Sequence, residues 1–111
     1  MPRYQYVVLT NPVEGREDEY NEWYSKTHIR EVSQIPGFKS ANRYKIVNRP
    51  SAKAPLKHQY MALYEMETDD VEATLAELGR RSAAGELAKS TALNGDVTST
   101  TLVELIAEYK K

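Results

Sequence analysis

The chain of 111 residues has the length of one ordinary domain, and we expect a single domain over residues 1–111 with one hydrophobic core. A formal net charge of −1 gives no broad basic field, so we expect neither nucleic acid nor an anionic membrane as a partner. The lack of cysteine excludes disulfides, zinc thiolate sites and thiol nucleophiles, and no apolar stretch approaches the length of a membrane span, so we expect a soluble, cytoplasmic protein.

The first half of the chain predicts a strand, a helix and a turn. Residues 4–10 are β-branched and aromatic and are closed by Asn11 and Pro12, as in a strand that ends in a turn. Residues 15–34 begin with acidic side chains and then carry apolar side chains at helical spacing, which predicts an amphipathic helix. We expect a break near His28, then a short second helical piece before the turn at Pro36 and Gly37.

Two strands separated by a loop come next. Residues 38–47 alternate in polarity, which places Phe38, Asn42, Tyr44 and Ile46 on one face and Lys39, Ala41, Arg43 and Lys45 on the other. Residues 48–57 contain two prolines and have no periodicity, so we expect a loop. The following strand alternates as well, and its shared face would carry His58, Tyr60, Ala62, Tyr64 and Met66.

The last third predicts one more helix and one more strand. Asp69 and Asp70 offer a cap for a helix over residues 71–81, with Val71, Leu75 and Leu78 facing inward. Residues 82–96 suggest a further helical turn around Leu87. Residues 98–108 are rich in threonine and aliphatic side chains and predict a strand, although residues 102–109 taken alone also fit a helix.

The element order is strand, helix, strand, strand, helix, strand. This is the ferredoxin-like βαββαβ arrangement of the α+β class, in which both helices cover one face of a four-stranded antiparallel sheet. The strands carry too many apolar side chains for the other face to stay in water. We therefore expect a homodimer formed through the open sheet face.

One run of residues resembles a known group of proteins. Trp23, Tyr24 and His28, followed by a turn of Pro36, Gly37 and Phe38, are similar to the helix signature of the dimeric α/β-barrel superfamily, and most similar to the small EthD-like proteins. The strand YMALYEME and the helix opening DDVEATLAEL extend the likeness over roughly residues 4–80. Relatives often carry proline where this chain has Arg30.

The resemblance implies a ferredoxin-like protomer, a dimer whose sheets form a barrel, and a small pocket between helix and sheet. Enzymes of the wider superfamily include cofactor-independent monooxygenases, polyketide cyclases, lactone isomerases and haem-degrading oxygenases. A shared fold does not by itself assign one of these reactions.

His28 and Tyr24 are the candidate catalytic residues. An imidazole titrates near neutral pH and serves as a general acid or base, and Tyr24 lies four residues earlier on the same helical face. The candidate ligand-binding residues are Tyr20, Trp23, Asn42, Tyr44, Tyr60 and Tyr64. Aromatic side chains at these spacings also pack cores and dimer seams, and His28 is equally consistent with a structural hydrogen bond to the backbone.

Metal and cofactor signals are weak. His28 and Glu31 have a spacing that suits a metal ion, but no third ligand is apparent, so we expect no metal site. His58, at a strand start beside the proline-rich loop, is a weaker ligand-binding candidate. No GxGxxG, P-loop or GxSxG motif is present, and we expect no dinucleotide, ATP or serine-hydrolase chemistry and no cofactor.

The leading hypothesis is a cofactor-independent enzyme that acts on a small aromatic or polyketide-like catabolite, as an isomerase, cyclase, lyase or monooxygenase. In it, His28 is the general acid or base and Tyr24 holds the developing oxyanion. A non-catalytic dimeric protein that binds a small hydrophobic or aromatic compound in a degradation pathway is the first alternative. A haem-binding or haem-degrading protein is the second.

Overall fold

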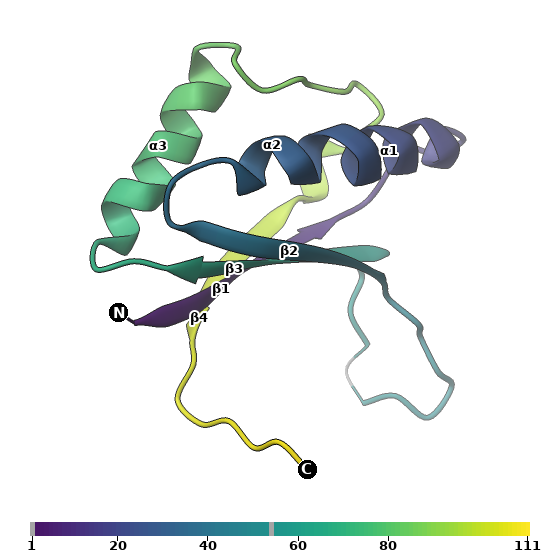
Figure 1. Cartoon of the computed structure of the whole chain (residues 1–111). Helices are drawn as coiled ribbons and strands as arrows, with labels where there is room; N and C mark the ends of the chain where they lie inside the picture. Colours follow the sequence, from purple (N-terminus) through teal and green to yellow (C-terminus); the bar gives the residue numbers. More distant parts are fainter. Residues whose placement is uncertain (1, 54) are drawn as a thin grey trace.

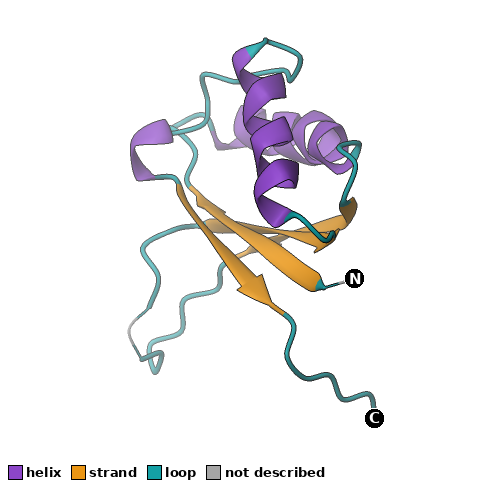
Figure 2. Ribbon diagram, turned by 90° about the vertical axis from the view of Figure 1, so that its left-hand side faces the viewer, coloured by secondary structure: helices purple, strands orange, loops and turns teal. Residues whose placement is uncertain are grey.

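The four strands form one antiparallel sheet in the order β2-β3-β1-β4, and the helices cover one face of it (Figures 1 and 2). A computed structural model describes residues 2–53 and 55–111, so position 54 of the predicted loop lies outside the described residues. In chain order the elements are β1 (Arg3–Thr10), α1 (Glu17–Trp23), a π-helical turn (Tyr24–His28), α2 (Ile29–Ser33), β2 (Phe38–Lys45), β3 (Tyr60–Glu67), α3 (Val71–Ala83), a 3₁₀ turn (Gly95–Val97) and β4 (Ser99–Glu104). The predicted ferredoxin-like α+β fold is confirmed.

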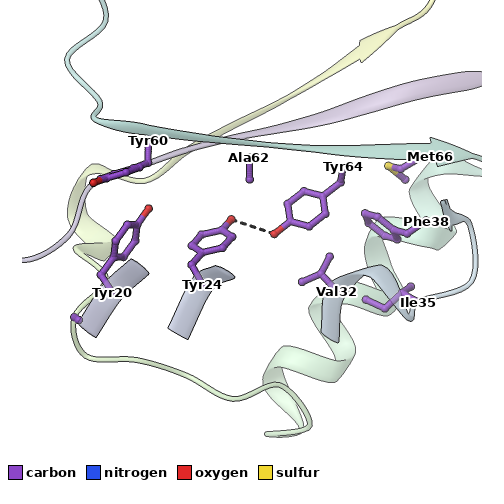
Figure 3. Packing of buried hydrophobic residues seen from close by; sticks show 10 residues of the cluster. Tyr20, Tyr24, Val32, Ile35, Phe38, Tyr60, Ala62, Tyr64 and Met66 are labelled. Carbon is purple, nitrogen blue, oxygen red and sulfur yellow. Dashed lines mark hydrogen bonds between the residues drawn. The ribbon is translucent and has the colours of Figure 1, made fainter. Parts of the chain in front are cut away.

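The core lies between the first helical segment and strand β3. The alternation predicted for β3 is confirmed, because Tyr60, Ala62, Tyr64 and Met66 are all buried beneath the helices. Figure 3 shows these side chains meeting a second set that extends toward the sheet from the helices and the turn after them. The labelled members of that second set are Tyr20, Tyr24, Val32, Ile35 and Phe38.

The short second helical piece predicted after His28 is present as α2, but the helix changes type near His28 and does not break. The helix continues through a π-helical turn, in which the N–H of Ile29 donates to the carbonyl of Tyr24, five residues earlier. Residues 29–33 contain no proline, so each of them keeps the backbone N–H donor that a helix needs to continue.

Strand β2 carries the largest error in the predicted faces. A β-bulge lies between Phe38 and Ser40, and it shifts the in-and-out alternation by one residue. Phe38 is therefore buried under the helices as predicted, but beyond the bulge Arg43 pairs with Ala62 and shares its inward face. The alternation pattern alone places Arg43 on the face opposite to that of Phe38.

Helix α3 is capped as predicted but stands away from the sheet. The carboxylate of Asp70 accepts a hydrogen bond of 3.0 Å from the N–H of Ala73. Within α3 only Thr74 is fully buried, while Leu75 and Leu78, which point toward the sheet, are half-buried. The apolar side chains of this helix are thus only partly covered by the other described residues.

The segment after α3 and the last strand both differ from the prediction. Residues around Leu87 form no helical turn, although the Leu87 side chain is buried. The following strand is shorter than expected, at Ser99–Glu104, and the alternative helix over residues 102–109 is not formed. None of the helices in the described part of the chain combines the length and apolarity needed to cross a lipid bilayer.

Gly37 permits the tight turn between α2 and β2, and we expect Gly37→Ala to be strongly destabilising. Its φ is +101°, and an added Cβ would lie 2.9 Å from Cγ2 of the buried Thr74. Left-handed strain and overpacking together predict a loss of about 3 kcal/mol in the free energy of unfolding, measured by urea denaturation. Gly85→Ala is the control, because φ is +76° there but no atom lies within 4 Å of the new Cβ. Equal losses in the two variants would contradict the role assigned to Thr74.

Candidate active site

The π-helical turn brings three aromatic rings together at the centre of the first helical segment. The ring of His28 stacks on Trp23 at a centroid distance of 4.6 Å, and it meets the ring of Tyr24 edge-on at 4.9 Å. Tyr24 and His28 stand at the two ends of this π-helical turn. The two predicted catalytic side chains are therefore neighbours.

The hydroxyl of Tyr24 is joined to the sheet by one hydrogen bond. Tyr64 donates to the Oη of Tyr24 at 3.1 Å, as the dashed line in Figure 3 shows. Burial raises the pKa of Tyr24 to about 12 and also raises the pKa of Tyr64, so both phenols remain protonated at neutral pH. Since Tyr64 supplies the proton of this bond, the proton of Tyr24 is free to be donated to another oxygen.

His28 is a neutral imidazole at physiological pH. Burial lowers its pKa to about 4, the nearby Glu31 opposes this shift, and Arg43 adds to it. Its Nδ1 atom is buried and has no hydrogen-bond partner among the described residues. The alternative role, a structural hydrogen bond to a backbone carbonyl, is not seen at this atom. A neutral imidazole can accept a proton at the ring nitrogen that carries none.

Arg43 is the residue of this site that the sequence pattern missed. Its guanidinium carbon lies 4.4 Å from the ring centroid of Tyr24, and 5.2 Å from those of Tyr20 and Tyr60. Nη1 donates to the hydroxyl of Ser25 at 2.7 Å. A cation held against the ring face of Tyr24 favours negative charge on that phenol and disfavours a proton on the nearby imidazole.

A hollow of about 340 Å³ opens between α3 and the sheet beside these groups; we call it the inner hollow. It is lined by Tyr6, Val8, Tyr24, His28, Val32, Tyr64, Leu75, Leu78, Gly79, Ser82, Leu87 and Thr100. A second, outer hollow of about 260 Å³ is lined by Trp23, His28, Ser82, Leu87, Ala88, Lys89, Ser90 and Leu93. The side chains common to both, His28, Ser82 and Leu87, form the wall between them.

One residue of the segment after α3, Ala88, makes two hydrogen bonds to the first helical segment. The N–H of Ala88 donates to a carboxylate oxygen of Glu31 at 2.9 Å, and its carbonyl accepts from the indole N–H of Trp23 at 3.1 Å. These two bonds hold Leu87 against the hollows. Glu31, considered above as a possible metal ligand beside His28, is instead engaged with the backbone.

Tyr20 and Tyr60, both predicted to bind ligand, lie outside the inner hollow. The hydroxyl of Tyr20 is hydrogen-bonded to that of Thr10, and the hydroxyl of Tyr60 donates to Glu17 and accepts from Asn21. Both rings pack in the core, which is the alternative role considered for Tyr20. Trp23 lines the outer hollow only.

Asn42 and Tyr44 do not face the site. Asn42 pairs with Leu63 and Tyr44 pairs with Met61, so both side chains point to the open face of the sheet. The physical reason is the bulge at the start of β2, which reverses the alternation on which their inward placement depended. The ring of His58 is bonded at 2.7 Å to the carbonyl of Val97, away from both hollows.

Several lining residues were not singled out from the sequence as site residues. Gly79, Ser82 and Thr100 carry no motif, and only the helical spacing of Leu75, Leu78 and Ser82 indicates a shared face on α3. Across residues 2–53 and 55–111, no three His, Cys, Asp or Glu side chains are grouped so that they could hold a metal ion.

The chain matches one family model. Residues 3–79 match the family model described as Domain of unknown function (DUF4286). No curated protein matches the chain.

Solved structures share the fold. An EthD-family protein of Bacillus halodurans is 22% identical, with 96% of this chain and 100% of that chain covered and a TM-score of 0.63. MhuD, a haem degrader of Mycobacterium tuberculosis, is 14% identical, with coverage of 96% and 99% and a TM-score of 0.67. A dimeric ferredoxin-like protein of Jannaschia is 18% identical, with coverage of 93% and 99% and a TM-score of 0.58. At these identities the likeness shows the fold alone, which is the EthD-like fold expected from the sequence.

The lowered pKa of His28 predicts a pH-dependent stability. The unfolded chain binds a proton at this residue near pH 6.5 and the folded chain only near pH 4, so stability is full above pH 6.5 and falls as the pH drops between these values. From pH 7.5 to pH 5 this residue should remove about 2 kcal/mol. Urea unfolding at both pH values should show a smaller loss for His28→Phe, which keeps an aromatic ring but does not titrate. An equal loss in both proteins would show that His28 is not the group responsible.

Proposed function

We propose that this chain, which belongs to the DUF4286 family of domains of unknown function, is a cofactor-independent enzyme that removes a proton next to a carbonyl of a small aromatic or polyketide-like compound. The observation that carries the proposal is the pairing of a neutral, unpartnered imidazole with a phenol that has a free proton, both lining one hollow. This pair of groups suits the first step of isomerisation, cyclisation, lyase and cofactor-independent oxygenation reactions alike.

With an enolisable ketone as the substrate, the proposed step is the removal of a proton from the carbon next to the carbonyl. His28 accepts the proton as the C–H bond breaks, the electron pair forms a carbon–carbon double bond, and the carbonyl oxygen becomes an enolate. Tyr24 donates its free proton in a hydrogen bond to that oxygen, and the bond from Tyr64 stabilises negative charge passed to Tyr24. Arg43 lies over the Tyr24 ring and adds a positive charge to the same region.

The low pKa of the imidazole limits the substrates that it serves. A base with a pKa of about 4 removes a proton readily only when the carbon acid is activated, because proton transfer to a weak base is uphill. We therefore expect substrates whose C–H is next to a carbonyl and also benzylic or next to a second carbonyl. Aromatic and polyketide-like compounds carry such positions.

We propose a homodimer formed through the open face of the sheet as the active assembly. Val7, Leu9 and Leu63 lie on this face, together with Tyr44 and Val103, which are 50% and 47% exposed. The loop between β2 and β3 and the chain after β4 both extend on this side, away from the helices (Figure 1). An apolar face of this kind is covered most simply by the same face of a second copy.

Proton exchange gives a direct test of the catalytic proposal. We expect the protein to catalyse exchange of the C1 protons of 2-tetralone in D₂O, followed by NMR, and we expect His28→Gln to reduce the rate by about 10²–10⁴-fold. Tyr24→Phe should reduce it by about 10²-fold, because the enolate loses its donor. Lys26→Ala, an exposed residue outside the hollow that pairs only with Glu22, is the control.

Three other results would redirect the assignment. Binding of 2-tetralone without exchange would favour the non-catalytic binding protein. A Soret band on addition of haemin, lost in His28→Gln, would favour haem binding. Exchange that is unchanged in His28→Gln would exclude the imidazole as the base.

Sedimentation velocity tests the dimer. The wild type should sediment with twice the 12.6 kDa mass of one chain, and Leu63→Glu should shift it toward one chain, because a carboxylate cannot be buried unpaired in the interface. Ala76→Glu, on the exposed side of α3, should leave the mass unchanged. Dissociation by both variants, or by neither, would place the interface elsewhere.

A further inference from the structure

The inner hollow contains no charged group. Its polar atoms belong to phenols, aliphatic hydroxyls and the neutral imidazole of His28, and no lysine, arginine, aspartate or glutamate lines it. An ionised carboxylate or phosphate placed here would lose its water without gaining a counter-charge, which is strongly unfavourable. The lining therefore selects an uncharged ligand, and it offers no cation for the two propionates of a haem.

The hollow exists because α3 does not settle on the sheet. Leu75 and Leu78 face the sheet yet remain half-buried, since the space between them and Tyr6 is open. A groove lined by apolar side chains and a few hydroxyls suits a flat ring system that carries one oxygen. Such a ligand would complete the packing that the described residues leave unfinished.

The packing of the surrounding residues does not explain why residue 79, which lines this hollow, is a glycine. It lies in the interior of α3, on the same face as Leu75 and Ser82, and no atom comes within 4 Å of a Cβ added there. Glycine inside a helix is less favourable than alanine, and here an alanine would fit without a clash. The glycine is thus not required by the packing of the protein itself.

The inner and outer hollows meet at His28, Ser82 and Leu87, which line both of them. Leu87 is next to Ala88, whose two hydrogen bonds reach Trp23 and Glu31. The inner hollow extends along α3, beside the bare backbone at Gly79.

We propose that Gly79 is a specificity-determining residue, which admits the second ring of an uncharged, flat, two-ring ligand against the backbone of α3 while its oxygen accepts a hydrogen bond from Tyr24. This proposal rests on the proposed function for the position of the reacting groups. It adds the size and charge of the ligand, and it assigns the residue that sets them.

Two substitutions at Gly79 separate protein stability from ligand room. Gly79→Ala should raise the thermal unfolding midpoint, since the helix gains propensity and nothing clashes. Gly79→Leu places a side chain in the hollow. It should weaken binding of 2-naphthol by about tenfold or more, because the leucine would occupy the space of the second ring. Phenol, with one ring, should bind to both variants within about threefold of the wild type. Binding is measured by titration calorimetry.

Two controls test the position of the added side chain on α3 and the charge of the ligand. Ala76→Leu adds the same side chain on the exposed side of α3 and should leave both affinities unchanged. The anionic 2-naphthoate should bind the wild type at least about tenfold more weakly than 2-naphthol.

The outcomes distinguish this proposal from the catalytic one. If 2-naphthol binds Gly79→Leu as it binds the wild type, if phenol is lost equally, if naphthoate binds as well as naphthol, or if the wild type binds no naphthol, the proposal is overturned. Loss of proton exchange in His28→Gln would then still support the catalytic role of His28. Conversely, naphthol binding that depends on Gly79 in a protein without exchange would support the ligand assignment and reject the enzyme.

Discussion

The hydrogen bond between the hydroxyls of Tyr64 and Tyr24 is the contact on which the rest of the site depends. It joins the π-helical turn to β3 inside the core, as the bond between Tyr20 and Thr10 joins α1 to β1. Because two buried hydroxyls must satisfy each other, the distance between the π-helical turn and β3 is fixed by this bond. That spacing sets the position of His28, which rests edge-on against the Tyr24 ring.

Burial acts on the acid and the base of the site in opposite directions, and both effects lead to neutral groups. It raises the pKa of the phenols and lowers that of the imidazole, so the site carries no ionised ligand-facing group at neutral pH. The guanidinium of Arg43 lies 4.4 Å from the centroid of the Tyr24 ring and does not line the inner hollow. A neutral chamber with a cation behind its donor stabilises negative charge that appears only during a reaction.

Most of the fold was predictable from sequence because β3 and the first helix carry strong periodicity, and both lie in the middle of the core. The errors occur where a local irregularity of the backbone changes the spacing of the residues that face the core. The bulge at Phe38 and Ser40 reverses the faces of β2, which hides Arg43 inside and places Asn42 and Tyr44 outside. The π-helical turn replaces an expected break. The hollow itself was beyond sequence reasoning, because it depends on how far α3 stands from the sheet, and no residue pattern encodes that distance.

The single tryptophan occupies a position that gives the protein an internal optical signal. Its indole stacks on His28 and donates its N–H to the carbonyl of Ala88, so it touches both the imidazole and the segment that walls the chamber. A protonated imidazole quenches indole emission, whereas a neutral one does so weakly, and displacement of residue 88 would change the polarity around the indole. The emission of Trp23 therefore records the charge state of the ring and the closure of the wall together, with no label and no second emitter of its kind to obscure it.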